Sequence, residues 1–267
     1  MKFALNHMTA PRLDWRALME MAQGLGCVGV EFRNDLGRAL FEGFTAETVA
    51  DEMTKAGLRT VGLSQVYPFN DWSEAIRHEV AGLITTAQDL EAETISLIPR
   101  NDGTRIGGDV LRTALREILP MLQEADMVAL VEPLGFERSS LRTKAETIEA
   151  IEAVGGTDHY KIVHDTFHHT LAGETEFFPE YTGIIHVSGV TETGLGIGQM
   201  EDAHRALVTE DDRLGNIAQI AALIGAGYDG PISMEAFSPQ IHQLTRDQIM
   251  AQLRGSFDFI RSRVAAA

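Results

Sequence analysis

Two kinds of apolar segment alternate along the chain. The first is an amphipathic stretch with apolar residues three or four positions apart, as in residues 14–25, and this spacing predicts a helix. The second is a short, almost uninterrupted apolar run, as in residues 28–32, which predicts a strand buried on both faces. Such runs predict eight strands, at residues 3–5, 28–32, 59–63, 94–98, 128–132, 161–163, 184–187 and 231–234.

Polar and small residues mark where the intervening helices begin and end. Thr45 has the side-chain oxygen of an N-cap residue, and Gly24, Gly26 and Gly57 interrupt the helical spacing. Further helices are predicted at residues 72–90, 110–124, 144–154, 217–224 and 245–264. We interpret the segment that precedes residue 184 as irregular, and residues 190–214 as a long excursion.

Regular alternation of strand and helix predicts a parallel sheet with right-handed crossovers. Eight such units favour an α/β fold of the closed (β/α)8 TIM-barrel type over a doubly wound sheet, and about 250 residues are typical for that barrel. The loop after the first strand, residues 6–11, contains no glycine, which argues against a dinucleotide-binding fold. No stretch resembles a linker, so we expect one domain over residues 1–267.

The composition of the chain limits which kinds of molecule it is expected to bind and where it is expected to reside. Hydrophobic residues make up 44% of the 267 positions, enough for one large core, and the single cysteine, Cys27, excludes an internal disulfide. The formal charge of −17 repels phosphate backbones and anionic lipid, so we expect no nucleic acid and no membrane partner. No run reaches the ~18 apolar residues that span a bilayer, and the N-terminus lacks a signal-peptide pattern. We therefore expect a cytoplasmic protein.

Four ionisable residues stand where consecutive strands end: Glu132, Asp165, His186 and Glu235. In a barrel these strand ends meet at one mouth, which is where active sites lie. Three carboxylates there would repel one another, and each buried charge would cost several kcal/mol. A divalent cation removes this repulsion. Carboxylate and imidazole ligands suit Mn²⁺, Mg²⁺, Co²⁺ or Zn²⁺, and the absence of thiolates argues against a structural zinc site.

Each of these residues alone has a simpler explanation. A glutamate at a strand end is more often an ion-pair partner, and a histidine in an apolar run is more often part of the core. The four together, in order on strands five to eight, favour a metal-dependent enzyme that acts on a small oxygen-rich molecule.

Several segments carry a family resemblance: residues 3–6 (Phe-Ala-Leu-Asn), 30–33 (Val-Glu-Phe-Arg), 67–70 (Tyr-Pro-Phe-Asn), 129–132 (Ala-Leu-Val-Glu), 164–168 (His-Asp-Thr-Phe-His), 185–186 (Ile-His) and 233–237 (Ser-Met-Glu-Ala-Phe). The chain resembles the xylose-isomerase-like TIM barrels nearly end to end. Within that superfamily it is most similar to the 2-keto-myo-inositol (inosose) isomerases of inositol catabolism. The four ligand positions are shared across the superfamily, so they indicate mechanism more than substrate.

The resemblance implies roles for individual residues. It makes Glu132, Asp165, His186 and Glu235 the ligands of one divalent ion, and Glu132 and Glu235 also the acid–base pair. It implies substrate contacts for His168, Glu137, Arg33, Arg213 and Asn6. Two features depart from the family: the related epimerases have an arginine where this chain has Glu192, and Asp212-Arg213 is not followed by the usual Pro-Gly-x-Gly turn.

The resemblance implies an isomerase of keto-inositols or related α-hydroxy ketones of polyols, acting by proton transfer through an enediolate. A ketose 3-epimerase or a dehydratase of keto-cyclitols or keto-acids would use the same scaffold. A phosphodiesterase for damaged DNA is disfavoured by the acidic charge, and a non-catalytic sugar-binding barrel by the retained Glu132 and Glu235. Relatives are often dimers or tetramers, so a homo-oligomer is expected.

Overall fold

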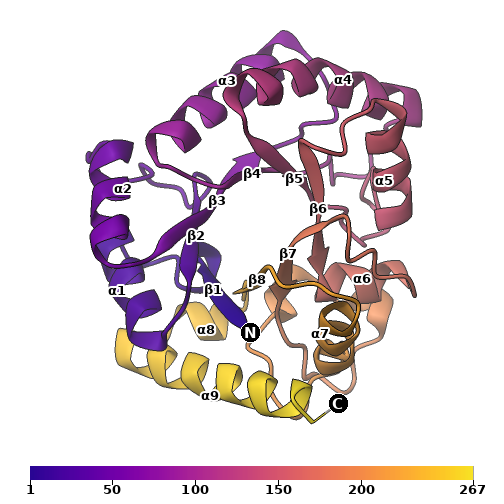
Figure 1. The fold of residues 1–267 in the computed structure, drawn as a ribbon. Coiled ribbons are helices and arrows are strands. Elements are labelled where there is room, and N and C mark those ends of the chain that lie inside the picture. The colour runs from indigo at the N-terminus through magenta and orange to yellow at the C-terminus, as the bar shows by residue number, and fades with distance from the viewer. Residues whose placement is uncertain (267) are drawn as a thin grey trace.

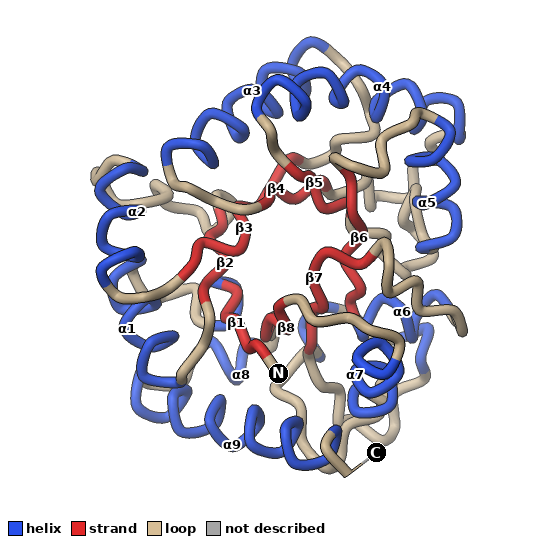
Figure 2. Tube along the Cα trace, in the orientation of Figure 1, coloured by secondary structure: helices blue, strands red, loops and turns tan. Residues whose placement is uncertain are grey.

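The computed structural model describes residues 1–266. Eight parallel strands follow one another in chain order and close into a barrel, because β8 pairs with β1. The strands form an inner ring that the helices surround (Figures 1 and 2). The predicted (β/α)8 barrel is thereby confirmed. The strands are β1 (Lys2–Asn6), β2 (Gly29–Arg33), β3 (Arg59–Val66), β4 (Thr94–Leu97), β5 (Val128–Val131), β6 (Tyr160–Asp165), β7 (Thr182–Val187) and β8 (Pro231–Met234).

The helices begin and end largely where the polar residues predict. Thr45 caps the second helix by accepting a hydrogen bond from the Thr48 amide, and Gly26 ends the first with a left-handed φ of 70°. The helices are α1 (Trp15–Leu25), α2 (Ala46–Lys55), α3 (Glu74–Asp89), α4 (Gly108–Ala125), α5 (Lys144–Ala153), α6 (Thr166–Ala172), α7 (Asn216–Gly225), α8 (Pro239–His242) and α9 (Arg246–Val264).

The structure corrects one interpretation of the connections and adds detail to another. The segment before residue 184 is not irregular throughout, because α6 follows β6 without a loop and its first four residues are all buried. The excursion at residues 190–214 holds two short 3-10 helices, Ile197–Gln199 and Asp202–His204. It returns to the barrel, where Gly189 and Ala206 form a β-bridge.

The barrel interior is layered. Its lower layer is an apolar cluster of Ala4, Val61, Leu130, Val163 and Ile184, one residue from each of five strands. Two positions further along the chain, four of these residues are followed by polar ones, Asn6, Glu132, Asp165 and His186, whereas the corresponding residue on β3 is the apolar Leu63. The larger apolar core lies between the strands and the helices and includes Phe3 and Leu5, the neighbours of Ala4. This alternation follows from the period of two in a strand.

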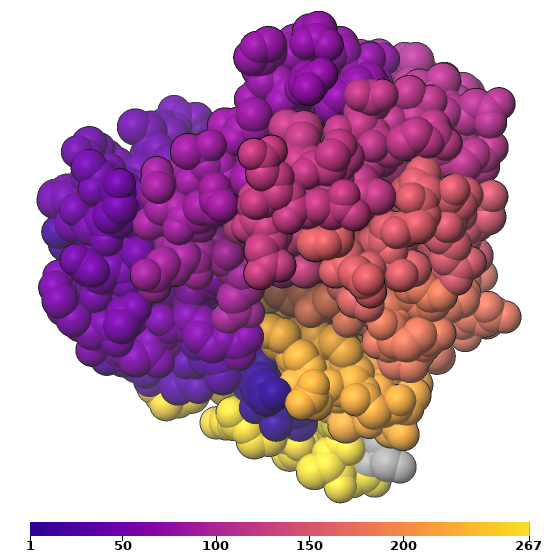
Figure 3. All heavy atoms as spheres, turned by 45° about the horizontal axis from the view of Figure 1, so that its top comes forward, coloured from indigo at the N-terminus to yellow at the C-terminus, as the bar shows by residue number. Residues whose placement is uncertain are grey.

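The two ends of the chain meet. The N-terminal strand β1 pairs with β8, and α1 contacts α9, so the indigo and yellow segments adjoin in the space-filling view (Figure 3). Within residues 1–266, none of the helices combines the length and the apolar character needed to traverse a bilayer.

Candidate metal centre and active site

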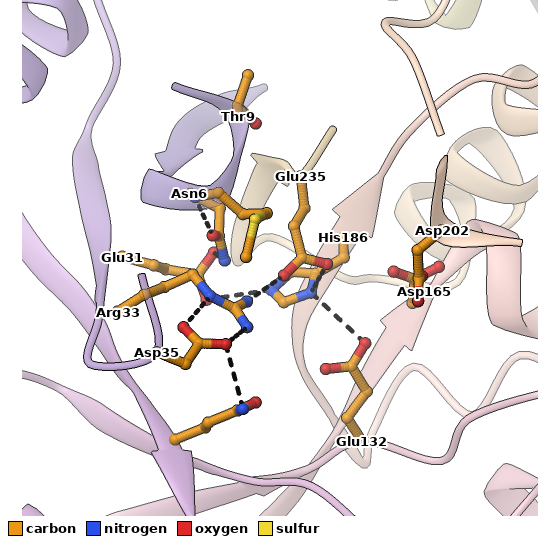
Figure 4. Close-up of polar contacts among 12 residues, drawn as sticks. Asn6, Thr9, Glu31, Arg33, Asp35, Glu132, Asp165, His186, Asp202 and Glu235 are labelled. Carbon is orange, nitrogen blue, oxygen red and sulfur yellow. Dashed lines mark hydrogen bonds and ion pairs between the residues drawn. The ribbon is translucent and has the colours of Figure 1, made fainter. Parts of the chain in front are cut away.

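The structure brings the four predicted ligands together at the mouth of the barrel. Glu132, Asp165, His186 and Glu235 each offer one ligand atom, these atoms all lie within 4.8 Å of one another, and all four residues are buried. Asp165 and His186 are register partners on β6 and β7, while Glu132 and Glu235 directly follow β5 and β8. The side chains therefore converge because neighbouring strands end at the same level (Figure 4).

Two guanidinium groups hold the carboxylate of Glu235. Arg33 Nη1 donates to Oε1 at 2.7 Å, and Arg205 Nη2 donates to Oε2 at 2.8 Å. Burial alone would raise the pKa of Glu235, but the adjacent His186, Arg205 and Arg33 outweigh burial and hold that pKa below its usual range. Glu235 is thus kept ionised, as a ligand carboxylate must be.

Arg205 is a site residue that the sequence did not identify. Its Nη2 also donates to Asp165 Oδ2 at 2.5 Å, and its guanidinium lies over the ring of Phe237 at 4.4 Å. Its backbone carbonyl accepts hydrogen bonds from the amides of Phe237 and Ser238 at 2.8 Å each. The residue lies in the excursion between β7 and α7, where no periodic pattern indicates which side chains return to the barrel.

Asp165 has two separate tasks. Its Oδ1 accepts hydrogen bonds from the amides of Phe167 at 2.7 Å and His168 at 3.0 Å, and so caps α6, while Oδ2 faces the site. The cap places His168 in the first turn of α6, beside the ligands. Gly135 packs tightly against this helix, since a Cβ at this position would come within 2.2 Å of the His168 carbonyl oxygen.

Glu132 is held much more loosely than Glu235. Its Oε1 lies 3.8 Å from His186 Nδ1 and 4.0 Å from His168 Nε2, distances too long for hydrogen bonds. The two glutamates are therefore unequal: two guanidiniums clamp Glu235, whereas Glu132 is free to reorient.

His186 is oriented from below. Its Nε2 lies 3.0 Å from Oε2 of Glu31, while Nδ1 points toward the carboxylates, 3.2 Å from Glu235 Oε2, without a hydrogen-bond partner in the described part of the chain. Burial lowers the pKa of His186, but Glu31 and Glu235 raise it well above 6.5. One ring nitrogen without a hydrogen-bond partner and three carboxylates around it form a donor set that suits a divalent cation. These four residues therefore fit such an ion.

A cavity of about 270 Å³ opens above the ligands. Four carboxylates and two guanidiniums line it, from Asp35, Glu132, Asp202, Glu235, Arg33 and Arg205. Apolar side chains, among them Leu134, Phe136 and Phe237, complete the wall. The cavity thus combines a polar floor with apolar surfaces that a carbon ring can contact.

The predicted substrate contacts fall into two groups. Arg33 and His168 line the cavity. The other three do not belong to the lining: Asn6 is fully buried and bonded to Glu31, Glu137 is exposed, and Arg213 donates to the Glu192 carbonyl oxygen. Glu31, Asp35 and Asp202 join the site instead. In the sequence, Glu31 stands in the second apolar run. To recognise that its side chain points into the barrel, the register of this strand against β1 must be known.

Comparisons with known proteins agree with this architecture. The model of a family described as "Xylose isomerase-like TIM barrel" matches residues 19–263. An inosose isomerase of Halalkalibacterium halodurans is 24% identical over 206 residues, which cover 72% of this chain and 71% of that protein. A xylose isomerase domain containing protein from Salmonella typhimurium LT2 has 31% identity, a TM-score of 0.92 and 97% coverage of both chains. The IolI protein, crystallised with a bound zinc atom, shares the fold with 18% identity, 99% coverage of both chains and a TM-score of 0.87.

Proposed function

Since the chain belongs to the xylose isomerase-like TIM barrel family, we propose that it is a divalent-metal-dependent isomerase of keto-inositols or related neutral α-hydroxy ketones. The observation that carries this proposal is the convergence of Glu132, Asp165, His186 and Glu235 on one point at the floor of the cavity. The inosose isomerase relative and the zinc atom bound to IolI support the substrate class and the cation, respectively.

The charges around the cavity favour a neutral substrate over a keto-acid or a phosphate ester. Both guanidiniums are already paired, Arg33 with Asp35 and Glu235, and Arg205 with Asp165, Asp202 and Glu235. Four lining carboxylates exceed the two guanidiniums, and Asp165 and Glu31 add further negative charge. A divalent cation would offset only part of this excess, so an anionic substrate would meet repulsion.

The proposed chemistry is proton transfer between adjacent carbons. When bound, a divalent cation supplies Lewis acidity, which stabilises negative charge that develops on the substrate oxygens. Glu132 takes the proton from the hydroxyl-bearing carbon, because its carboxylate at the cavity floor receives no hydrogen bond from residues 1–266. His168, with Nε2 4.0 Å from Glu132 Oε1, hydrogen-bonds a substrate oxygen. Positioned acid–base groups supply about 10²–10⁴-fold acceleration.

The clamped glutamate, Glu235, has a different part in this proposal. Arg33 and Arg205 stabilise its ionised form and fix its orientation. Because Glu235 is held ionised, the protonated Glu132 returns the proton to the neighbouring carbon in an isomerisation, while Glu235 remains a ligand carboxylate. An epimerisation would require Glu235 to gain a proton first and to deliver it to the opposite face of the same carbon.

The test is incubation of the protein with 2-keto-myo-inositol and a panel of ketohexoses in D₂O, followed by NMR. The expected result is deuterium uptake with a new isomer of unchanged heavy-atom composition, lost after treatment with a chelator and restored by Mn²⁺. Loss of water from the product would identify a dehydratase instead. Absence of deuterium uptake with every substrate, in the presence of each candidate cation, would refute the proposal.

A further inference from the structure

Beneath the metal centre lies a carboxylate that the proposed chemistry does not use. Glu31, on β2, is fully buried inside the barrel. Its Oε2 lies 3.0 Å from His186 Nε2, and its Oε1 accepts a hydrogen bond from Asn6 Nδ2 at 3.2 Å. Asn6 and Glu31 are register partners on β1 and β2, so their side chains enter the interior side by side. Figure 4 shows the chain of contacts from Asn6 through Glu31 to His186.

The placement of this carboxylate is energetically demanding. A buried ion without a partner is penalised by several kcal/mol, so a fully buried glutamate needs strong local compensation. Among residues 1–266, His186 is the one ion-pair partner that the structure gives Glu31. The stabilisation of Glu31 therefore depends on the imidazole.

The contact decides which ring nitrogen is available to a cation. A carboxylate at Nε2 holds a proton on that nitrogen, so Nδ1 is the nitrogen that gives up its proton and offers a lone pair when a cation binds. Nδ1 is the nitrogen that faces Glu132 and Glu235. We propose that Glu31 is a positioning residue, held by Asn6, that fixes the tautomer and orientation of His186 and thereby sets the affinity for the divalent cation. This inference rests on the proposed metal centre.

Two substitutions of Glu31 distinguish the effect of its contact with His186 from the effect of its negative charge. In Glu31→Gln, the amide has one acceptor oxygen for two donors, so its NH₂ must face either Asn6 or His186. In Glu31→Asp, the charge stays inside the barrel but the side chain is one methylene shorter and withdraws from His186. Asp35→Asn is the matched control, because Asp35 is also a carboxylate near the site, yet it accepts from Arg33 and Gln65 and contacts no ligand.

The experiment measures the affinity for Zn²⁺ and Mn²⁺ by competition with a chromophoric chelator, and folding by circular dichroism of the metal-free proteins. Both Glu31 variants should bind about 10–100-fold more weakly than the wild type. Asp35→Asn should change the affinity roughly threefold or less, since its charge is partly exposed and screened. In ¹⁵N-histidine-labelled protein with Zn²⁺, the wild type should show His186 protonated at Nε2, and the Nε2–H proton signal should move upfield in the Glu31 variants.

The possible outcomes are distinguishable. Wild-type affinity in both Glu31 variants would overturn this inference and leave the proposed function untouched. Wild-type affinity in Glu31→Asp alone would also overturn it, because charge rather than contact would then be the cause. If Glu31→Gln does not fold, Glu31→Asp and the NMR signal of His186 decide. A wild-type protein that binds neither cation would overturn the metal assignment, and this inference with it.

Discussion

The inequality of the two glutamates leads to a prediction about stability as well as activity. Replacing either one by glutamine should abolish turnover, because each is a proposed ligand and Glu132 is also the proposed proton carrier. The effects on folding should differ. Glu235 accepts from Arg33 at 2.7 Å and from Arg205 at 2.8 Å, whereas Glu132 has no nitrogen within hydrogen-bond distance in the contacts described for it.

The magnitude follows from these contacts. In Glu235→Gln, one carboxylate oxygen becomes an NH₂ group, which opposes a guanidinium donor instead of accepting from it. A hydrogen bond to a charged group contributes about 1.5–3 kcal/mol, and breaking a buried ion pair costs about 3–5 kcal/mol. We expect the free energy of unfolding to fall by about 2–5 kcal/mol for Glu235→Gln and to change by less than ~1 kcal/mol for Glu132→Gln.

The assay is thermal unfolding of the metal-free proteins in chelator, followed by turnover after Mn²⁺ is added. For a chain of this size, each kcal/mol moves the midpoint by about 2–4 °C, so Glu235→Gln should melt at least ~2 °C below Glu132→Gln. Equal midpoints, or a lower midpoint for Glu132→Gln, would refute the assignment of one clamped and one free glutamate. Near-wild-type turnover in either variant would remove its proposed chemical role.

Two further predictions concern pH. Glu31 and Glu235 raise the pKa of His186 in the metal-free protein against the effect of burial, so a cation must displace a proton from this residue when it binds. The affinity of the protein for the cation should therefore increase up to about tenfold per pH unit through neutrality. A Zn²⁺ competition titration at pH 6.5 and 7.5 checks this, and an affinity that does not change with pH would contradict it. Burial lowers the pKa of His7 from 6.5 to about 4, despite its hydrogen bond to the Leu13 carbonyl. The unfolded chain thus takes up this proton first, and the contribution of neutral His7 to stability, complete above about pH 6.5, is lost as the pH falls toward 4, by at most ~1.4 kcal/mol per pH unit. Urea midpoints at pH 7 and 5 should therefore lie closer together in His7→Gln than in the wild type, and an unchanged difference would count against the assignment.

The barrel could be predicted from the sequence because its strands are short, apolar and regularly separated by amphipathic helices. The family resemblance is confirmed as well. The convergence of Glu132, Asp165, His186 and Glu235 was predictable for a related reason: parallel strands of a barrel end at one mouth, so residues at strand ends become neighbours.

The rest required three-dimensional information. α6 has four buried residues at its start, so it lacks the polar face that identifies an amphipathic helix. Arg205 reaches the site from a long connection whose path cannot be read from a periodic pattern. It supplies a guanidinium to the site, whereas residue 192, where the related epimerases have an arginine, is a glutamate here. Glu31 lies in an apolar run, where only the strand register shows that its side chain points inward. The substrate roles given to Asn6, Glu137 and Arg213 stay predictions, with none of the three in the cavity wall.

The double use of Asp165 restricts what evolution can place at that position. Asparagine would keep the helix cap but lose the negative charge, and glutamate would keep the charge but is too long to bond to the amides of Phe167 and His168. Because one short carboxylate joins the ligand set to the first turn of α6, a shift of that oxygen toward a cation is transmitted mechanically to His168. Inhibitor design could exploit this linkage, since a compound that pulls on Asp165 would also displace the histidine.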